Sequence, residues 1–300
     1  MAFTTLDTCD AVHSSGKTRD GFESECVREI VMICRQVAGV TGEGLVMSSI
    51  YLINVGSNTS HSTRARNPIF ANGSFKYVPF PYPSEDESAL PDYAPEVRPF
   101  VRMERLVGWE THADPDWTNL TYGDICIRGR GGALKNVESG DTLLFWGLLW
   151  ENSSRDWSGF TGRQGWYLLG AIRVHDIVAD RTSLARLSVR ELARARANAH
   201  LDGGSALASG HRVFVGDLAR SKRFQQAVDL GATERDGLLY RAITAADGRT
   251  LTHGGSPPWS SSLRACRRMW DLSNPQDRAR AKLVQRAIGR CDDYDLFAGT

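Results

Sequence analysis

Long apolar runs are missing from this chain of 300 residues. It holds no stretch of about 18 consecutive apolar residues, so the sequence predicts no helix that spans a membrane. Its first residues also lack the basic stretch followed by an apolar run that marks a secretory signal. We therefore expect a cytoplasmic protein that does not enter a membrane.

An excess of charge of one sign is missing as well. The chain has 36 Lys and Arg residues against 35 Asp and Glu residues, which gives a formal net charge of +1. Binding to phosphates usually shows as a basic excess or a basic face. The overall charge therefore argues against broad, non-specific coating of nucleic acid, although it leaves room for a local basic face.

Paired cysteine motifs and familiar catalytic signatures are also absent. None of the six cysteines forms a C-x-x-C pair, so a zinc site of the knuckle type is unsupported. In a chain of this length without a signal peptide, we expect the thiols to be reduced. The chain has no G-x-S-x-G and no H-E-x-x-H motif, and no G-x-G-x-x-G in a βαβ context.

Two regions differ in character. Residues 1–46 are mostly polar and aperiodic, with one short amphipathic pattern, so they are interpreted as an N-terminal extension that is either disordered or one short helix. Met47 stands just before the first convincing strand, at residues 50–55. We expect residues 47–300 to form a single domain.

That domain combines strands and helices. Asn72-Gly73 between apolar segments predicts a hairpin turn. The apolar runs 141–150 and 165–178, joined by a polar linker, predict an antiparallel pair of strands. A helix is expected to begin near Ser183 or Ser188 and to end by residue 200, and further helices are expected over residues 221–230 and 275–291. A further strand is expected over residues 211–217. The order of these elements indicates the α+β class.

The two apolar runs also suggest how the sheet closes. Strands that are apolar along nearly their whole length are typical of the wall of a small, closed, mixed or antiparallel β-barrel of the PUA-like kind, here with flanking helices. The alternative is an ordinary hairpin within another α+β domain.

The segment "THADPDW" is the strongest candidate for chemistry. If it is extended, its alternation aims His112, Asp114 and Asp116 to one face. Such a set suits acid–base catalysis, or a divalent metal as cofactor with Asp114 and Asp116 as ligands. The alternative is a turn in which the two carboxylates cap backbone N–H groups around Pro115.

Further polar and aromatic residues are candidates for binding. Loops at strand ends often carry binding groups, arginine can hold phosphate bidentately, and aromatic rings can stack on bases. On these grounds the candidates are Asn58, Ser60, His61, Arg64, Arg66, Arg128, Arg130, Trp146, Trp166 and Arg264. The alternatives are solvated loops and rings that simply pack in the core.

Several stretches together resemble a known family. "INVGSN", "NPIFANGSFKYVPFP", "THADPDW", "GDTLLFWGLL", "GWYLLGAIRV", "HRVFVGD" and "LTHGGSPPWSSSLRACRRMWDL" look like nucleotide modification associated domain 3, over about residues 47–275. The resemblance implies a domain of phage and bacterial systems thought to modify or recognise DNA bases, without an established reaction. It also implies a paired-histidine patch after the barrel strand, where this chain has only His200, in "ANAH".

Three functions therefore remain open. The first is recognition of a base or nucleotide, or an accessory role in DNA base modification. The second is a metal-assisted or acid–base enzyme that acts on a nucleotide or base, and the third is a structural or interaction protein. The expected partner is a nucleotide or nucleic acid, DNA rather than RNA, and the sequence does not decide whether the protein is an enzyme.

Overall fold

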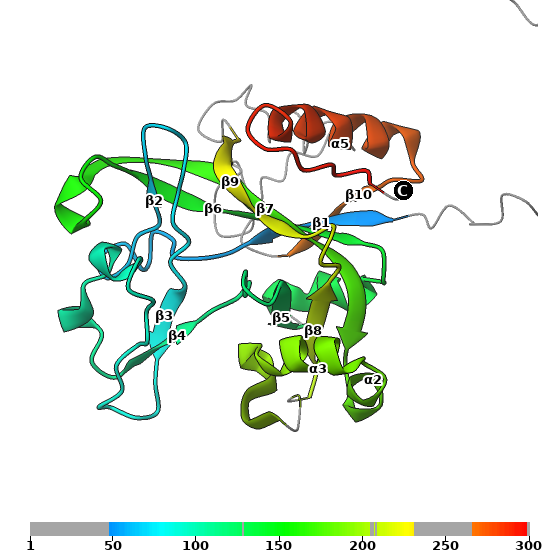
Figure 1. Ribbon diagram of the computed structural model, residues 1–300, viewed down its shortest axis with the longest axis horizontal. Coiled ribbons are helices and arrows are strands. Elements are labelled where there is room, and N and C mark those ends of the chain that lie inside the picture. The colour runs from blue at the N-terminus through cyan, green and yellow to red at the C-terminus, as the bar shows by residue number, and fades with distance from the viewer. Residues whose placement is uncertain (1–47, 128, 205–206, 208, 231–265, 299–300) are drawn as a thin grey trace, which may run out of the picture. The chain divides into compact units, whose positions relative to one another are not determined.

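Figure 1 shows the computed structural model of the chain, which describes residues 48–127, 129–204, 207, 209–230 and 266–298. The expected N-terminal extension, residues 1–46, lies outside these ranges. So do two of the candidate binding residues, Arg128 and Arg264.

Most strands belong to one eight-stranded sheet. Its strands are β1 (Ser49–Asn54), β2 (Pro68–Ile69), β5 (Thr121–Ile125), β6 (Thr142–Asn152), β7 (Phe160–Val178), β8 (His211–Gly216), β9 (Lys222–Asp229) and β10 (Arg267–Asp271). The order along the sheet is β10-β1-β6-β7-β8-β5, with β2 also paired to β6 and β9 also paired to β7. A separate antiparallel ribbon is formed by β3 (Phe80–Pro83) and β4 (Trp109–His112).

The long strands β6 and β7 form the centre of the sheet. They pair antiparallel from Thr142 opposite Arg173 to Asn152 opposite Phe160, which confirms the predicted pair. The turn before β6 anchors β1, because one carboxylate oxygen of Asp141 accepts the Ser49 N–H at 2.6 Å and the other accepts the Glu138 N–H at 2.9 Å. The loop before β6 thereby fixes the start of the parallel β1–β6 pairing.

The sheet is not seen to close. Within the described ranges, its order runs from β10 at one end to β5 at the other, and no pairing joins these two strands. The α+β class is thus confirmed, with much sheet and few helices, whereas the closed PUA-like barrel stays a prediction.

The helices are short except at the C-terminal end. They are α2 (Arg181–Ala185), α3 (Val189–Arg196) and α5 (Pro275–Ile288), with 3₁₀ turns η1 (Arg98–Phe100), η2 (Met103–Arg105), η3 (Gly129–Asn136), η4 (Trp157–Gly159) and η5 (Ala199–Gly204). Of the two expected starts of the helix before residue 200, Ser188 is the N-cap of α3 and accepts the Glu191 N–H, whereas Ser183 lies in the separate short helix α2.

The predicted helix over residues 221–230 is wrong, since this segment is strand β9. Its buried residues Phe224, Ala227 and Val228 follow the i, i+3, i+4 spacing of a helix, which misled the prediction. In the structure they belong to a strand that pairs antiparallel with β7, with a register shift between Leu168 and Gly170. The register shift in the β7–β9 pairing therefore gives the buried residues of β9 the spacing that is typical of a helix.

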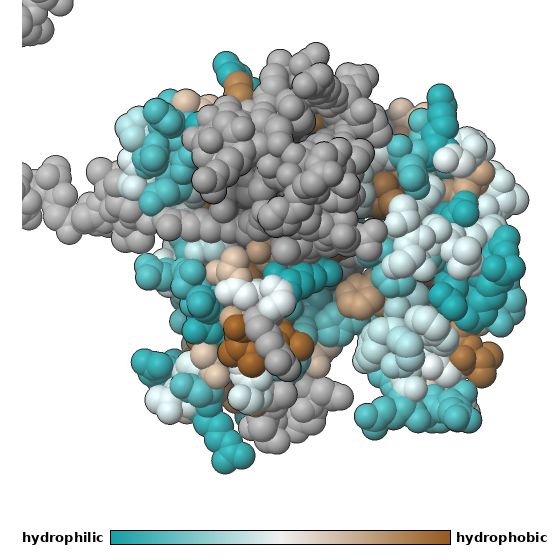
Figure 2. Space-filling model, turned by 180° about the vertical axis from the view of Figure 1, so that it is seen from behind, coloured by the Kyte–Doolittle hydropathy of each residue, from teal (hydrophilic) through white to brown (hydrophobic). Residues whose placement is uncertain are grey.

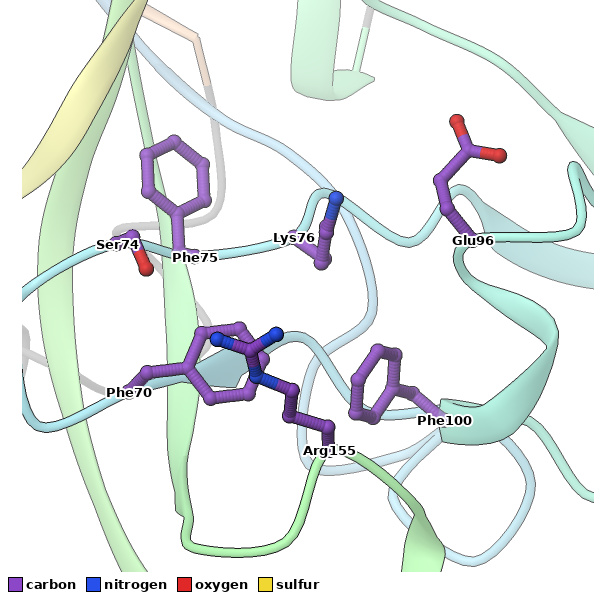
Figure 3. A pocket seen from close by; sticks show the side chains of 7 residues that line it. All are labelled: Phe70, Ser74, Phe75, Lys76, Glu96, Phe100 and Arg155. Carbon is purple, nitrogen blue, oxygen red and sulfur yellow. The ribbon is translucent and has the colours of Figure 1, made fainter.

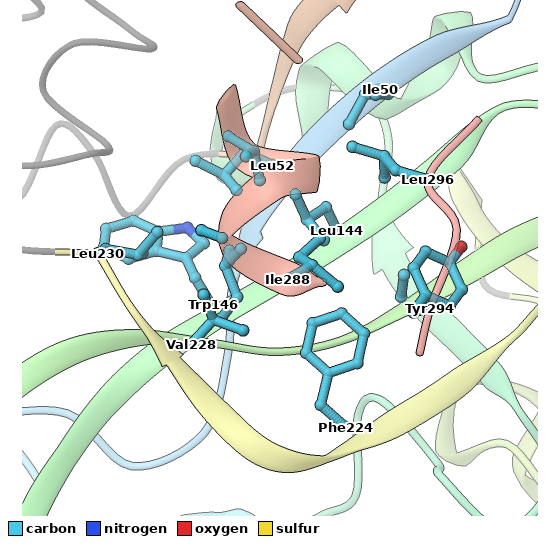
Figure 4. Close-up of a cluster of buried hydrophobic side chains, with 14 of the residues drawn as sticks. Ile50, Leu52, Leu144, Trp146, Phe224, Val228, Leu230, Ile288, Tyr294 and Leu296 are labelled. Carbon is cyan, nitrogen blue, oxygen red and sulfur yellow. The ribbon is translucent and has the colours of Figure 1, made fainter. Parts of the chain in front are cut away.

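Both faces of the central strands are buried. On one face α5 and the C-terminal residues pack on the sheet, with Ile288 and Leu296 close to Leu144 and Ile50 (Figure 4). Alternate residues such as Tyr51 and Phe145 belong to a second buried cluster. Burial on both sides explains why the strands are apolar at nearly every position. No helix in the described ranges is long and apolar enough to cross a membrane.

The α5 face gives a first test of the fold. Leu144 is fully buried there, so Leu144→Ala should lower the free energy of unfolding by about 2–5 kcal/mol, through lost apolar burial and the cavity left behind. Urea denaturation followed by circular dichroism measures the change. As a control, Val107→Ala should change it by less than about 0.5 kcal/mol, because Val107 is 62% exposed. Equal effects of the two substitutions would contradict this packing.

Candidate functional site

A cavity of about 130 Å³ lies where the β3–β4 ribbon meets β5 and η5. It is lined by Phe80, His112, Asp114, Tyr122, Gly123, Asp124, Ile125, Arg130 and His200. Seen from behind, the molecular surface is hollowed between the side that carries β3 and β4 and the side that carries α3 and β8 (Figure 2). The site is therefore open to solvent on one side.

Three donor atoms converge in this cavity. His112 is the last residue of β4, Asp114 follows two residues later, and His200 belongs to η5. Asp114 Oδ2 lies 3.0 Å from His112 Nε2 and 2.8 Å from His200 Nε2. The two imidazole nitrogens lie 3.0 Å apart. Residues 88 positions apart in the sequence thus present their polar atoms to one point.

The carboxylate of Asp114 is buried, with only 3% exposed, and its two oxygens differ. Oδ1 accepts hydrogen bonds from the Gly123 N–H at 3.1 Å and from Asn198 Nδ2 at 2.9 Å. Oδ2 has no hydrogen bond of good geometry to any described residue, and it faces the two imidazoles. One oxygen is thus held by two hydrogen bonds, and the other faces the two histidines.

His200 is held on both sides. Its Nδ1 lies 2.9 Å from Nδ1 of His211, the first residue of β8. Its backbone N–H donates to Asn198 Oδ1 at 3.0 Å. Asn198 therefore positions His200 and Asp114 together, and His211 orients the imidazole so that Nε2 faces the carboxylate.

Aromatic rings fix His112. The Phe80 ring lies 5.2 Å from it and the Tyr82 ring meets it edge-on at 5.7 Å. The His61 ring also stacks on Phe80, with the two ring centroids 5.7 Å apart. Of the predicted binding loop after β1, His61 is thus the residue that reaches the wall of the site through Phe80.

The charges within the cluster support one another. Burial raises the pKa of Asp114, but the short polar contacts and the charge of His112 and His200 outweigh it, so the net pKa lies below its ordinary value. Burial lowers the pKa of His200, but the short contact with Asp114 and the charge of that carboxylate outweigh it, so the net pKa is raised. The ionised carboxylate therefore attracts positive charge into the cavity.

The third residue of the predicted set is used differently. Asp116 Oδ1 accepts the backbone N–H groups of Thr118 and Asn119, at 2.9 and 3.0 Å, and its Oδ2 accepts Asn119 Nδ2. Asp116 therefore caps a turn, as the alternative interpretation predicted, while Asp114 joins the histidines. The predicted alternation does not hold because β4 ends at His112.

The predicted binding residues are dispersed. Arg130 lines the cavity and donates to the Asn54 carbonyl. Asn58 accepts hydrogen bonds from Ser60 within their own turn. Arg64 and Arg66 lie over the rings of Trp109 and Trp157.

The two predicted stacking residues lie in the core. Trp146 and Trp166 are 1% and 9% exposed, and their ring centroids are 4.8 Å apart. Both belong to the hydrophobic cluster beneath α5. Their rings therefore contact other apolar side chains rather than face the cavity.

Sequence reasoning missed His200, His211 and Asn198 as members of the site. His200 was noted as a lone histidine, but its partners come from β4 and β8, which no local spacing can show. The short segment "ANAH" indicates a site only when Asn198 and His200 are considered together, since the Asn198 side chain accepts the His200 N–H.

The donor set fits a divalent metal ion. Two imidazoles and one carboxylate are the ligands of the facial triad that holds non-haem iron(II), and imidazole also suits zinc, copper and nickel. Donor atoms about 2.1 Å from one ion and at right angles to each other lie about 3.0 Å apart, close to the distances found here. A second group, His175, Asp176 and Glu191, is more exposed and is joined by ion pairs.

The fold and site define an α+β protein in which two partly exposed histidines surround a buried aspartate at an open cavity. The family model for nucleotide modification associated domain 3 matches residues 49–277, and the chain belongs to this family. The match supports a role in nucleotide modification systems. No curated protein and no solved structure matches the chain.

The electrostatics of the metal-free cluster can be tested by titration. Because Asp114 raises the pKa of His200, the imidazole should titrate above its ordinary value of about 6.5, and Asp114→Asn should lower that pKa. The pair should stabilise the fold below about pH 6.5, and this contribution should fade as pH rises through the raised pKa. NMR of the imidazole signals with a chelator present measures the titration. A His200 pKa that is the same in Asp114→Asn would contradict the contact, and Asp116→Asn serves as the control.

Proposed function

We propose that His112, Asp114 and His200 bind one divalent metal ion, and that the protein is a metal-dependent enzyme acting on a nucleotide or nucleobase. The observation that carries the proposal is that three donor atoms, two imidazole nitrogens and one buried carboxylate oxygen, lie within 2.8–3.0 Å of one another. The family match supports the substrate class, because it is a family of nucleotide modification systems.

Each ligand would act through a defined atom. His112 and His200 would bind through Nε2, and Asp114 through Oδ2, because Oδ1 already accepts two hydrogen bonds. With Nε2 on the metal, His200 would carry its proton on Nδ1, and this N–H would donate a hydrogen bond to His211 Nδ1. Metal-binding histidines usually donate their other N–H in this way, so His211 would take the place of the more common carboxylate or carbonyl acceptor. Three protein ligands leave positions for water or substrate, which a catalytic metal requires.

The cavity walls suit a polar, planar substrate. The Phe80 and Tyr122 side chains line it, and Asp124 and Arg130 add an acceptor and a donor on the same wall. Tyr122 donates to Asp124 Oδ2 at 2.7 Å, which fixes that carboxylate. A base placed there would meet hydrogen-bonding groups beside the metal, as enzymes that act on bases provide.

Metal titration tests the proposal directly. Isothermal titration of the chelator-treated protein with Fe²⁺ under anaerobic conditions, and with Mn²⁺, Co²⁺ and Zn²⁺, should show one ion per chain. Asp114→Asn and His200→Gln should each weaken binding at least about tenfold, because each removes a ligand. The controls Asp116→Asn and His175→Gln should bind as the unchanged protein does.

Two other outcomes decide between the remaining functions. If no metal binds but nucleosides raise the melting temperature, the protein is a recognition or accessory factor and the enzyme proposal fails. Binding that all four variants retain would place the metal elsewhere and would also contradict the proposal.

A glycine beside the ligands provides an independent test. A Cβ at Gly123 would lie 2.3 Å from His200 Cδ2 and 2.7 Å from Asn198 Oδ1, so Gly123→Ala must displace the imidazole or its support. We expect metal affinity to fall about tenfold or more while the protein stays folded by circular dichroism. Gly132→Ala is the matched control, since no atom lies within 4 Å of its Cβ position. Unchanged affinity in Gly123→Ala would show that His200 is not a ligand.

A further inference from the structure

Two segments next to the ribbon place arginines on one face. Arg102 N–H donates to the Arg64 carbonyl at 2.7 Å, and Arg66 N–H donates to the Phe100 carbonyl at 3.2 Å. Ala65 and Val101 form the antiparallel bridge between them. Opposite residues, and residues two apart, point to the same side of such a pair, so Arg64, Arg66 and Arg102 share a face.

Each of these arginines lies over an aromatic ring. The guanidinium of Arg64 is 4.3 Å from the Trp109 ring centroid. Those of Arg66 and Arg102 are 4.9 and 4.6 Å from the same ring, that of Trp157. Aromatic rings and cations therefore alternate along this face.

The alternation continues into a second pocket. Phe160 contacts Phe100, whose ring lies 6.0 Å from that of Phe70, and Arg155 lies 5.9 Å above Phe70. Figure 3 shows the Arg155 guanidinium over the Phe70 ring, at the edge of the pocket. This pocket has a volume of about 300 Å³ and is lined by Phe70, Ser74, Phe75, Lys76, Glu96, Phe100 and Arg155.

Among the described residues, the cations of this face have no carboxylate as a counter-ion. In the part of the chain that the structure describes, no carboxylate forms an ion pair with Arg64, Arg66, Arg102 or Arg155. Arg98 and Arg163, by contrast, are paired with Asp92 and Glu151. Two guanidinium groups on one indole ring repel each other, so an anion bound between them would be stabilised.

The same ribbon carries one end of this face and one residue of the proposed metal site. Trp109 begins β4 and His112 ends it, so the strand rise places their Cα atoms about 10 Å apart, while strand alternation points their side chains to opposite faces of the ribbon. The turn at residues 61–64, in which Arg64 N–H donates to the His61 carbonyl, contacts the ribbon at two places. His61 stacks on Phe80, and Arg64 lies over Trp109.

We infer that this arginine–aromatic face, formed by Arg64, Arg66, Arg102 and Arg155 with Trp109, Trp157, Phe160 and Phe70, binds single-stranded nucleic acid. The arginines would hold backbone phosphates, and the Phe70 pocket would take one unstacked base, with Ser74, Lys76 and Glu96 at its edge. A duplex keeps its bases stacked, so it could not fill the pocket. The inference rests on the proposed function for the reaction at the metal site. It deepens that function by making the substrate a polymer rather than a free nucleotide.

Fluorescence anisotropy with a labelled 12-nucleotide DNA strand tests the inference, alongside RNA of the same sequence and the DNA duplex. The double variant Arg66→Gln/Arg102→Gln should bind the single strand at least about tenfold more weakly, and its salt slope should fall by about 1.4 for two lost phosphate contacts. Phe70→Ala should weaken binding without changing that slope. The charge-matched control Arg98→Gln/Arg163→Gln should stay within about twofold of the unchanged protein.

The outcomes separate this inference from the metal proposal. Asp114→Asn should keep its affinity for the oligonucleotide while losing the metal, so either claim can fail alone. Comparing the DNA and RNA arms identifies the strand. Absence of binding, equal binding of duplex and single strand, or an equal loss in the control double variant would overturn the inference, provided that circular dichroism shows all variants folded.

Discussion

The buried carboxylate of Asp114 is the constraint on which the site depends. An ionised group removed from water is costly unless it is paired and hydrogen-bonded. The chain meets this requirement for one oxygen with Gly123 and Asn198, and it places two imidazoles beside the other. Because those contacts come from β5 and from the segment around η5, the carboxylate joins parts of the chain that are distant in sequence. The contacts that stabilise the buried charge of Asp114 therefore also orient the oxygen that we propose as a metal ligand.

The sheet supplies the rigidity that this arrangement needs. The β6–β7 pair is buried on both faces and carries β8 at the end of β7, and β8 in turn pairs with β5. His211 stands at the start of β8, opposite Ile125 at the end of β5, so the support of His200 is set by strand register. The β3–β4 ribbon brings His112 to the same place from outside the sheet. It also connects the cluster to the arginine–aromatic face, so chemistry and binding would share one scaffold.

Sequence patterns predicted the frame better than the site. The long apolar strands were predicted correctly because burial on both faces leaves a continuous apolar signal. The Asn72-Gly73 turn is confirmed by the Gly73 N–H, which donates to the Phe70 carbonyl, and by the positive φ of 80° at Gly73. Strand β9 was missed because Phe224, Ala227 and Val228 imitate helical spacing. In "THADPDW", local pattern could not separate Asp114 from Asp116, since only the distant His200 distinguishes a ligand from a turn cap. Likewise, Trp146 was expected to stack on a base because a sequence does not show which face of a strand is covered.

The most direct test of the central claim is to locate the ion itself. Anomalous diffraction from crystals grown with Mn²⁺ or, anaerobically, with Fe²⁺ would do so. The account predicts one peak within about 2.0–2.2 Å of His112 Nε2, Asp114 Oδ2 and His200 Nε2, with the remaining positions facing the cavity. A peak that none of these atoms contacts, or a cluster that stays metal-free at saturating ion while the imidazoles bond to the carboxylate and to each other, would contradict it.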